Sequence, residues 1–315
     1  MNIRKDLKVE TLNKNFGYYI KVNEVLFSKK TKYQDLEILQ TEAFGKMLRL
    51  DKVFQTSEKE EYLYHEPLVH VPGVTMNGPK KALVIGGGDG GAIEEFLKYN
   101  TLEKVYMVEL DGEVVEACKK YIPNICKGAF ESSKVDLRIE DGIRFIQKTN
   151  ETFDQVMLDL TDPFGPSVAL YTKEFYKEIN KHLFAGGALS LHIESPISRP
   201  EVFGRLYRTL KSVFNNVSVM LNYVPLYGTL WAYAVASQEL DVNEISKLEV
   251  DQRIKSLGLK DLQFYNGDTH LGLLSLPNYV RDILAQDHEI IEKTTELINE
   301  DEVYHNYAII EEVNA

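Results

Sequence analysis

Residues 81–100 read KALVIGGGDGGAIEEFLKYN, and this stretch decides the fold. KALVI is a short apolar run of the kind that forms a buried strand, whereas AIEEFLKYN carries its apolar residues at helical spacing. The residues between them, GGGDGG at 86–91, let the backbone turn tightly and approach a ligand at the positive end of the helix. The stretch therefore predicts a strand, a tight turn and a helix, with the turn either purely structural or placed against a ligand.

Four more units of the same kind follow along the chain. The strand-like runs are KVYMVEL, VDLRIED, FDQVMLDL and GALSLHI, and each precedes a helical pattern, the last near residues 201–213. Five strand-then-helix units in succession predict an α/β fold, a doubly wound and mainly parallel sheet with helices on both faces. NVSVMLNYV and TLWAYAVAS then predict a strand pair that closes one edge of this sheet.

The uncharged segment 212–238 is long enough to span a bilayer. Asn215, Asn222, Pro225 and Gly228 interrupt it, so two buried strands joined at PLYG fit better than a membrane helix. We therefore expect no membrane association.

The segments that flank the five units predict a second, smaller domain and a helical C-terminal part. FGYYIKV, YQDLEILQ and KMLRLDKVFQTSE have the β-branched and aromatic content of a small antiparallel sheet. We expect residues 1–75 to form an N-terminal β-strand domain and residues 76–315 a Rossmann-like catalytic domain. Helical patterns around 243–257 and 278–300 predict C-terminal helices, whereas the role of the residues beyond 285 stays open.

Composition limits the classes of function. The 315 residues include 36 Lys and Arg against 48 Asp and Glu, a net charge of −12, which argues against nucleic-acid binding. The acidity suits a cationic partner, although surplus surface carboxylates explain it equally well. Cys118 and Cys126 are too few for a disulfide framework, and the first 15 residues contain no apolar signal core, so we expect a cytoplasmic protein. We see no cluster of His, Cys and acidic residues at ligand spacing and expect no metal.

Acidic residues close the second and third strands of the predicted sheet. Glu109 follows Asp89 by 20 residues, where a carboxylate can accept both hydroxyls of a ribose. Asp141, with Gly142 after it, could bind an adenine amino group. These positions predict a nucleoside across the carboxyl ends of the strands, either in a dinucleotide or in S-adenosylmethionine or a relative. The terminal strand pair is typical of the S-adenosylmethionine-dependent methyltransferase type of fold.

The fourth strand ends in DLTDPFGP at residues 159–166. Asp159 and Asp162 at the top of the sheet form a site for a cation or a general base, and the Pro and Gly after them could form a gate. A simple turn that begins at Asp162 fits the same residues equally well.

Together these motifs resemble those of the polyamine aminopropyltransferases. GGGDGG, VELD, the Asp141–Gly142 pair and DLTDPFGP occur in the family's order. DKVFQTSEKEEYLYHEPLVHVP is similar to the block that enters the family's active site, and PLYG and FYNGDTHLGLLSLP match later blocks. The resemblance covers roughly residues 30–285.

The resemblance implies that an amine attacks the aminopropyl methylene of decarboxylated S-adenosylmethionine and releases 5′-methylthioadenosine. An alkylamine with a pKa of about 10 must lose a proton before it attacks, and Asp159 matches the position of the base. Alignment of nitrogen, carbon and sulfur in a closed site is expected to contribute more than proton abstraction. The nucleoside is then a co-substrate, and no prosthetic group is expected.

The same match assigns binding residues. The nucleoside and the aminopropyl arm would be held by Gln34, His65, Asp89, Glu109, Asp141 and Gly142, with Pro166 in the gate against the adenine side. The amine would be held by Tyr64, Asp159, Asp162, His192 and Tyr227, where tyrosine rings attract cations and tolerate methylenes, and Glu194 could add to its negative surroundings. The tyrosines could instead be core aromatics and His65 a structural histidine. We expect His70 to be structural and His182, His288 and His305 to face solvent.

Two residues depart from the family pattern. His192 stands where many relatives have glutamine; a neutral imidazole can accept an amine proton, whereas an imidazolium would repel a cation. Leu160 replaces a common serine, which leaves the size of the amine pocket open. Putrescine is the expected acceptor, with agmatine, cadaverine and spermidine as alternatives.

Two other classes of function stay open. A methyltransferase is disfavoured because the carboxylate of intact S-adenosylmethionine would face like charges, and a polyamine-binding scaffold is disfavoured because the site residues are complete. Family resemblance implies a homodimer or homotetramer, with the N-terminal strands, or these strands together with the C-terminal helix, at the contact.

Overall fold

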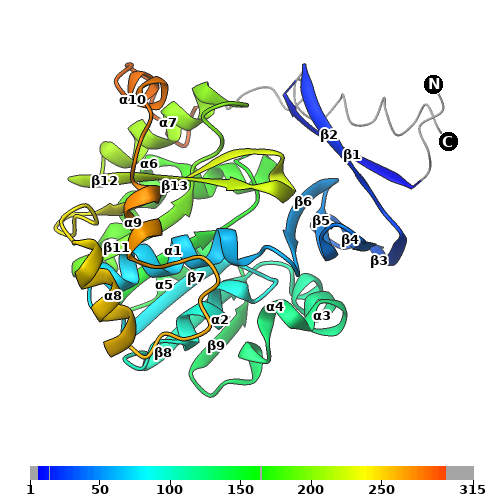
Figure 1. Ribbon diagram of the computed structural model, residues 1–315, viewed down its shortest axis with the longest axis horizontal. Coiled ribbons are helices and arrows are strands. Elements are labelled where there is room, and N and C mark those ends of the chain that lie inside the picture. Colours follow the sequence, from blue (N-terminus) through cyan, green and yellow to red (C-terminus); the bar gives the residue numbers. More distant parts are fainter. Residues whose placement is uncertain (1–5, 14, 164, 296–315) are drawn as a thin grey trace.

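The computed structural model describes residues 6–13, 15–163 and 165–295, without the side chains of residues 165 and 166. In these ranges the strands form three sheets (Figure 1). Strands β1 (Leu7–Asn13) and β2 (Phe16–Lys21) form an antiparallel pair. A four-stranded antiparallel sheet contains β3 (Glu24–Lys30), β4 (Asp35–Thr41), β5 (Gly45–Leu50) and β6 (Val53–Ser57). The predicted N-terminal antiparallel strands are thus confirmed.

The largest sheet has seven strands in the order β12-β13-β11-β10-β7-β8-β9. The parallel strands are β7 (Lys81–Gly86), β8 (Lys104–Glu109), β9 (Val135–Ile139), β10 (Phe153–Asp159) and β11 (Leu183–His192). Strands β12 (Asn216–Val224) and β13 (Thr229–Ser237) are antiparallel and close one edge, as predicted from the uncharged segment. This order confirms the doubly wound fold, and it reverses direction between β7 and β10, where α/β sheets bind ligands.

Helices cover both faces of this sheet (Figure 1). Alternate β7 residues point to opposite faces: Ala82 and Val84 belong to one core cluster, and Leu83 and Ile85 to another. The first cluster includes residues of α1 (Tyr62–Thr75), α2 (Gly91–Leu97), α8 (Lys247–Ser256) and α9 (Gly267–Leu273). The second includes residues of α5 (Gly142–Lys148), α6 (Lys173–Lys181), α7 (Pro200–Lys211) and α10 (Asn278–Leu284).

The remaining helices of the described residues lie in the connections between strands. They are α3 (Gly112–Tyr121), α4 (Pro123–Cys126) and the short 3-10 helices η1 (Ala129–Glu131), η2 (Gly165–Tyr171) and η3 (Pro225–Tyr227). No helix in the described part of the chain is long and apolar enough to cross a membrane.

Helix α1 was not predicted from the sequence. It lies inside the segment 1–75, and it contacts β10, β11, β12 and β13 of the large sheet. Residues 64–74 are all buried, so the helix lacks the alternation of apolar and polar faces that reveals a surface helix. Pro67 and Pro72 further obscure the pattern because proline is unfavourable inside helices.

The helix predicted over 278–300 is shorter than expected. It ends at Leu284, and residues 285–295 are not helical, while 296–300 lie outside the described residues. The backbone N–H of Ile291 donates to Thr209 Oγ1, and its carbonyl accepts from the Lys173 N–H. These contacts with α7 and α6 use backbone groups that a continuing helix would have required.

Gly86 generates a prediction about stability. Its φ is +86°, and a Cβ there would lie 2.0 Å from the backbone oxygen of Asp159. Gly86→Ala should therefore lower the free energy of unfolding by roughly 2–5 kcal/mol through backbone strain and overpacking, as measured by urea denaturation. Gly186, with φ +74° and nothing within 4 Å, is the matched control; its alanine variant should lose only about 1–2 kcal/mol. Equal losses would contradict the steric explanation.

Candidate active site

A cavity of about 360 Å³ lies at the carboxyl ends of the parallel strands. Strands β7, β8, β10 and β11 contribute residues to one side, and β1, β5 and β6 of the smaller sheets contribute to the other. Eleven predicted site residues line it: Gln34, Tyr64, His65, Asp89, Glu109, Asp141, Gly142, Asp159, Asp162, His192 and Tyr227. Pro166 belongs to η2, but its side chain lies outside what the structure describes.

One half of the cavity, the glycine-turn half, is lined by residues of the turn at 86–91 and by two acids at or just after the ends of strands of the large sheet, Glu109 and Asp141. Glu109 accepts a hydrogen bond from the Asp111 N–H at 2.8 Å, and burial raises the pKa of Glu109 to about 7. Asp141 caps α5 by accepting from the N–H groups of Ile143 and Arg144. The Gln34 side chain donates to Asp111 at 3.2 Å. These bonds fix the polar groups in place before any ligand arrives.

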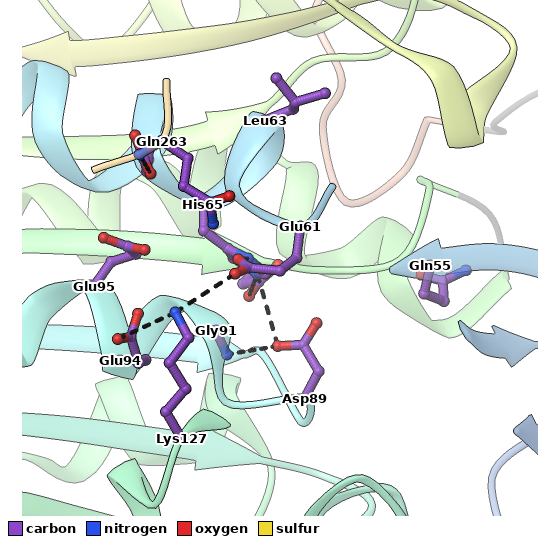
Figure 2. Close-up of polar contacts among 12 residues, drawn as sticks. Gln55, Glu61, Leu63, His65, Asp89, Gly91, Glu94, Glu95, Lys127 and Gln263 are labelled. Atoms are coloured by element: carbon purple, nitrogen blue, oxygen red, sulfur yellow. Dashed lines mark hydrogen bonds and ion pairs between the residues drawn. The ribbon is translucent and has the colours of Figure 1, made fainter. Parts of the chain in front are cut away.

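His65 joins the two halves of the cavity. Its Nδ1 lies 2.9 Å from Glu61, and its Nε2 lies 3.6 Å from Asp89 and 3.7 Å from Asp159. Figure 2 shows His65 above Asp89, whose carboxylate also accepts from the Gly91 N–H. Burial alone would lower the pKa of His65, but the three carboxylates outweigh it and raise the pKa well above its ordinary value. His65 is therefore an imidazolium at neutral pH.

The His65 cluster also bears on metal binding. Sequence reasoning saw no group at ligand spacing, but the fold brings donor atoms of His65, Asp89 and Asp159 within 4.8 Å of one another. The structure thus places one imidazole and two carboxyl groups together at a point that residue spacing in the sequence did not reveal.

Aromatic rings form the wall of the second half of the cavity, the aromatic half. The rings of Tyr64 and Tyr227 meet edge to face with their centroids 6.2 Å apart, and the ring centroids of Tyr227 and Trp231 are 4.9 Å apart. The Tyr227 hydroxyl donates to the backbone oxygen of Gln55 on β6. Both tyrosines line the cavity, and so does Trp231, which sequence reasoning missed. Asp159 Oδ2 is buried here without a hydrogen-bond partner among the described residues.

The contacts of His192 define which ring nitrogen carries the proton. Nε2 lies 2.7 Å from the Tyr171 hydroxyl and 3.1 Å from the Leu160 backbone oxygen. Because that hydroxyl donates to the Thr161 oxygen, Nε2 is the donor in both contacts. Burial lowers the pKa of His192, although Asp162 and Asp159 oppose this. The ring is therefore neutral, and its buried Nδ1 is an acceptor that has no partner in the described structure.

The far end of the aromatic half is rich in buried acids. Glu10 on β1 and Glu194 after β11 both line the cavity, and burial raises the pKa of each to about 8. Arg199 lies between Asp162 and Glu194. Glu10 and Arg199 were missed by sequence reasoning because β1 and the loop after β11 carry no motif.

The other histidines of the described residues lie outside the cavity lining. His70 is fully buried between the Tyr99 hydroxyl and Glu95. The prediction that His288 faces solvent is wrong: it is 7 % exposed and packs against Gly204 of α7. His182 is half-buried and contacts the Glu151 backbone oxygen, and His305 lies outside the described residues.

Two family models match the chain. Residues 61–247 match the spermine/spermidine synthase domain, and residues 8–58 match the spermidine synthase tetramerisation domain. The chain belongs to the spermine/spermidine synthase family. As a family member it is a polyamine aminopropyltransferase, a transferase.

Individual relatives agree with this family membership. The polyamine aminopropyltransferase of Nitrosomonas europaea is 44% identical over 285 residues, which cover 90% of this chain and 88% of that protein. The enzyme of the same name from Sulfurisphaera tokodaii is 40% identical over 271 residues, covering 85% and 90%.

Solved structures of family members share the fold. A spermidine synthase in complex with the transition state analogue AdoDATO has a TM-score of 0.83 at 32% identity, covering 90% of this chain and 96% of that chain. The spermidine synthase from Thermotoga maritima has a TM-score of 0.81 at 31% identity, with the same coverage.

Glu10 generates a prediction about pH for this family member. Its pKa rises from 4.5 to about 8 on folding, so between these values the folded chain holds a proton that the unfolded chain has lost. Stability should therefore fall with rising pH, by up to about 1.4 kcal/mol per pH unit from this group. Glu10→Gln should flatten that slope in denaturation experiments between pH 5 and 8, because Gln stays neutral and still accepts from the Phe54 N–H. Glu24→Gln is the control: Glu24 is exposed on β3, so this variant should keep the wild-type slope. A wild-type slope in Glu10→Gln as well would contradict the raised pKa of Glu10.

Proposed function

We propose that this polyamine aminopropyltransferase moves the aminopropyl group of decarboxylated S-adenosylmethionine to putrescine, giving spermidine and 5′-methylthioadenosine. The observation that carries the proposal is that one cavity contains two kinds of surface on either side of Asp159. Glu109 and Asp141 line one half, and the rings of Tyr64 and Tyr227 line the other. In the reaction the amine nitrogen bonds to the methylene carbon next to sulfur. The carbon–sulfur bond breaks with its electron pair on sulfur, which becomes a neutral thioether.

The glycine-turn half suits the decarboxylated co-substrate. Glu109 would accept the ribose hydroxyls, and Asp141, Gly142 and Gln34 would bind around the base, with Pro166 on its outer side. Asp89 would bind the ammonium of the aminopropyl arm, and His65 would keep Asp89 and Asp159 close together despite their like charges. The carboxylate of intact S-adenosylmethionine would meet Asp89 unfavourably, which argues against methyl transfer.

The aromatic half suits a diamine. Tyr64 and Tyr227 would contact the methylenes, and their ring faces attract cations. Asp162 would bind the far ammonium. The reacting nitrogen would donate to Asp159 Oδ2, which is 3.7 Å from His65 Nε2, and to His192 Nδ1; neither acceptor has a hydrogen-bond partner among the described residues. Because His192 is neutral, it can accept this N–H without repelling a cation.

Other features support the wider assignment. The match of residues 8–58 to a tetramerisation domain supports a homotetramer, with a homodimer as the alternative. The buried free thiols of Cys118 and Cys126 agree with the reducing cytoplasm. Leu160 lines the cavity, so agmatine, cadaverine and spermidine are the alternative acceptors to compare with putrescine.

The function is tested by a product assay. Purified protein should release 5′-methylthioadenosine from decarboxylated S-adenosylmethionine only when an amine is added, and fastest with putrescine in a panel that includes cadaverine, agmatine and spermidine. Calorimetry should show tighter binding of the decarboxylated than of the intact co-substrate. Absence of product with every amine, or a preference for the intact form, would overturn the proposal.

Asp159→Asn tests the role of the proposed base. Turnover should fall by about 100-fold or more, because general-base catalysis and positioning are both removed. Binding of 5′-methylthioadenosine, measured by calorimetry, should change little. Asp154→Asn is the matched control, since Asp154 lies on the same strand outside the cavity lining and binds the N–H groups of Lys80 and Lys81. Near-normal turnover of Asp159→Asn would rule out the assigned role.

A further inference from the structure

One guanidinium group lies at the acidic end of the cavity. Arg199 precedes α7, and its side chain is 11 % exposed and lines the cavity. Its Nη1 lies 3.1 Å from Glu194 Oε1 and 3.4 Å from Asp162 Oδ2. Its Nε donates to the Leu12 backbone oxygen on β1 at 3.0 Å. Bonds to three separate segments of the chain therefore hold Arg199 in one position.

Three carboxyl groups surround this guanidinium. Asp162 and Glu194 bind it directly, and Glu10 lies near enough for its pKa to be lowered by the Arg199 charge, against the larger effect of burial. The N-terminal strand is anchored at the same place, since the Asn13 side chain donates to the Ser198 oxygen. Carboxyl groups from β1, from the loop after β10 and from the loop after β11 thus converge on one cation.

Glu194 has two features that a purely structural residue does not need. Its φ is +69°, a left-handed conformation that is unfavourable for glutamate, and such strain persists where the surroundings enforce it, often at ligand sites. Its Oε2 is buried with no hydrogen-bond partner among the described residues. The residue thus retains a buried carboxyl oxygen without a hydrogen-bond partner in the described structure, beside the guanidinium.

We propose that Arg199 sets the length of the amine acceptor by occupying the place where the third ammonium group of a triamine would bind. The inference rests on the proposed function, in which Asp162 binds the far ammonium of a diamine. A triamine would have to extend past Asp162. There its third ammonium group would meet the Arg199 guanidinium, which is already paired with Asp162 and Glu194. Fixed like charge in a buried site is an effective way to reject a competing ligand.

The same contacts predict what happens when the guanidinium is removed. Asp162, Glu194 and Glu10 would then face the cavity without Arg199. The Asp162 carboxylate, the carboxyl oxygens of Glu194 and Glu10 and the space vacated by the side chain would then form a binding site for an additional ammonium group. The acceptor preference should therefore shift toward the triamine rather than fall equally for all amines.

The experiment compares putrescine with spermidine as acceptors. The kcat/KM of each is measured from 5′-methylthioadenosine release, and the polyamine product is identified by mass. The wild-type protein should favour putrescine, and Arg199→Ala should raise the spermidine-to-putrescine ratio by about 10-fold or more, the size of a single pocket contact. Arg199→Met, which retains an extended apolar side chain but lacks the charge, should raise the ratio as well.

Two further variants separate charge from packing. Arg199→Lys retains a cation and should keep the preference for putrescine. The double variant Arg199→Ala/Glu194→Gln should lose much of the gain for spermidine, because one of the carboxyl groups that would bind the additional ammonium is missing. Arg205→Ala is the matched control: Arg205 is a similarly buried arginine on α7, bound to Glu289 outside the cavity lining, and its loss should leave the ratio unchanged.

The outcomes distinguish this inference from the proposed function. Absence of methylthioadenosine release by the wild type with any amine would overturn the proposed function itself. Release with equal use of putrescine and spermidine by the wild type would overturn the role of Arg199, and so would an unchanged ratio in folded Arg199→Ala or Arg199→Met. A selective gain for spermidine in either variant, with tetraamine product, would establish it.

Discussion

The cavity buries several carboxyl groups close together, and their mutual repulsion is the constraint on which the site depends. In the glycine-turn half, the His65 imidazolium lies between Asp89 and Asp159 and is itself held by Glu61. Figure 2 shows Glu61 in turn near Lys127, which also pairs with Glu94. A buried carboxylate without such compensation would take up a proton. His65 and Lys127 thus offset part of this repulsion, and Glu10 and Glu194, whose pKa values rise to about 8, relieve more of it by holding protons.

The N-terminal strands are part of this site rather than an appendage to it. Glu10 and Leu12 of β1 line the cavity, and the Tyr227 hydroxyl bonds to Gln55 of β6. The Tyr18 hydroxyl donates to the Leu226 oxygen in the same turn. Residues 8–58 match a tetramerisation domain, so the small sheets that line one side of the cavity also belong to the part of the chain that matches an assembly domain.

Sequence reasoning succeeded where local pattern and local structure coincide. Each parallel strand appears as an apolar run, and each strand-end acid lies at the same edge of the sheet because parallel strands share a direction. It failed where burial comes from distant segments. Helix α1 is buried on all sides and shows no helical periodicity, and His288 is covered by packing against α7, which no local pattern reveals.

The sequence by itself determined the five strand-then-helix units of the large sheet, its closing strand pair and the glycine turn. These features follow from short-range spacing, because strand ends, turns and caps are set by neighbouring residues. Eleven residues of the cavity lining were also named from the sequence, but some of them, such as Gln34 and Tyr64, only through the family resemblance. Only the tertiary structure decided that His65 is a cation between two acids, that His192 presents Nδ1 as an acceptor, and that Arg199 meets Glu194 and Asp162. Protonation and pairing depend on which groups share a buried space, and that is a property of the folded chain.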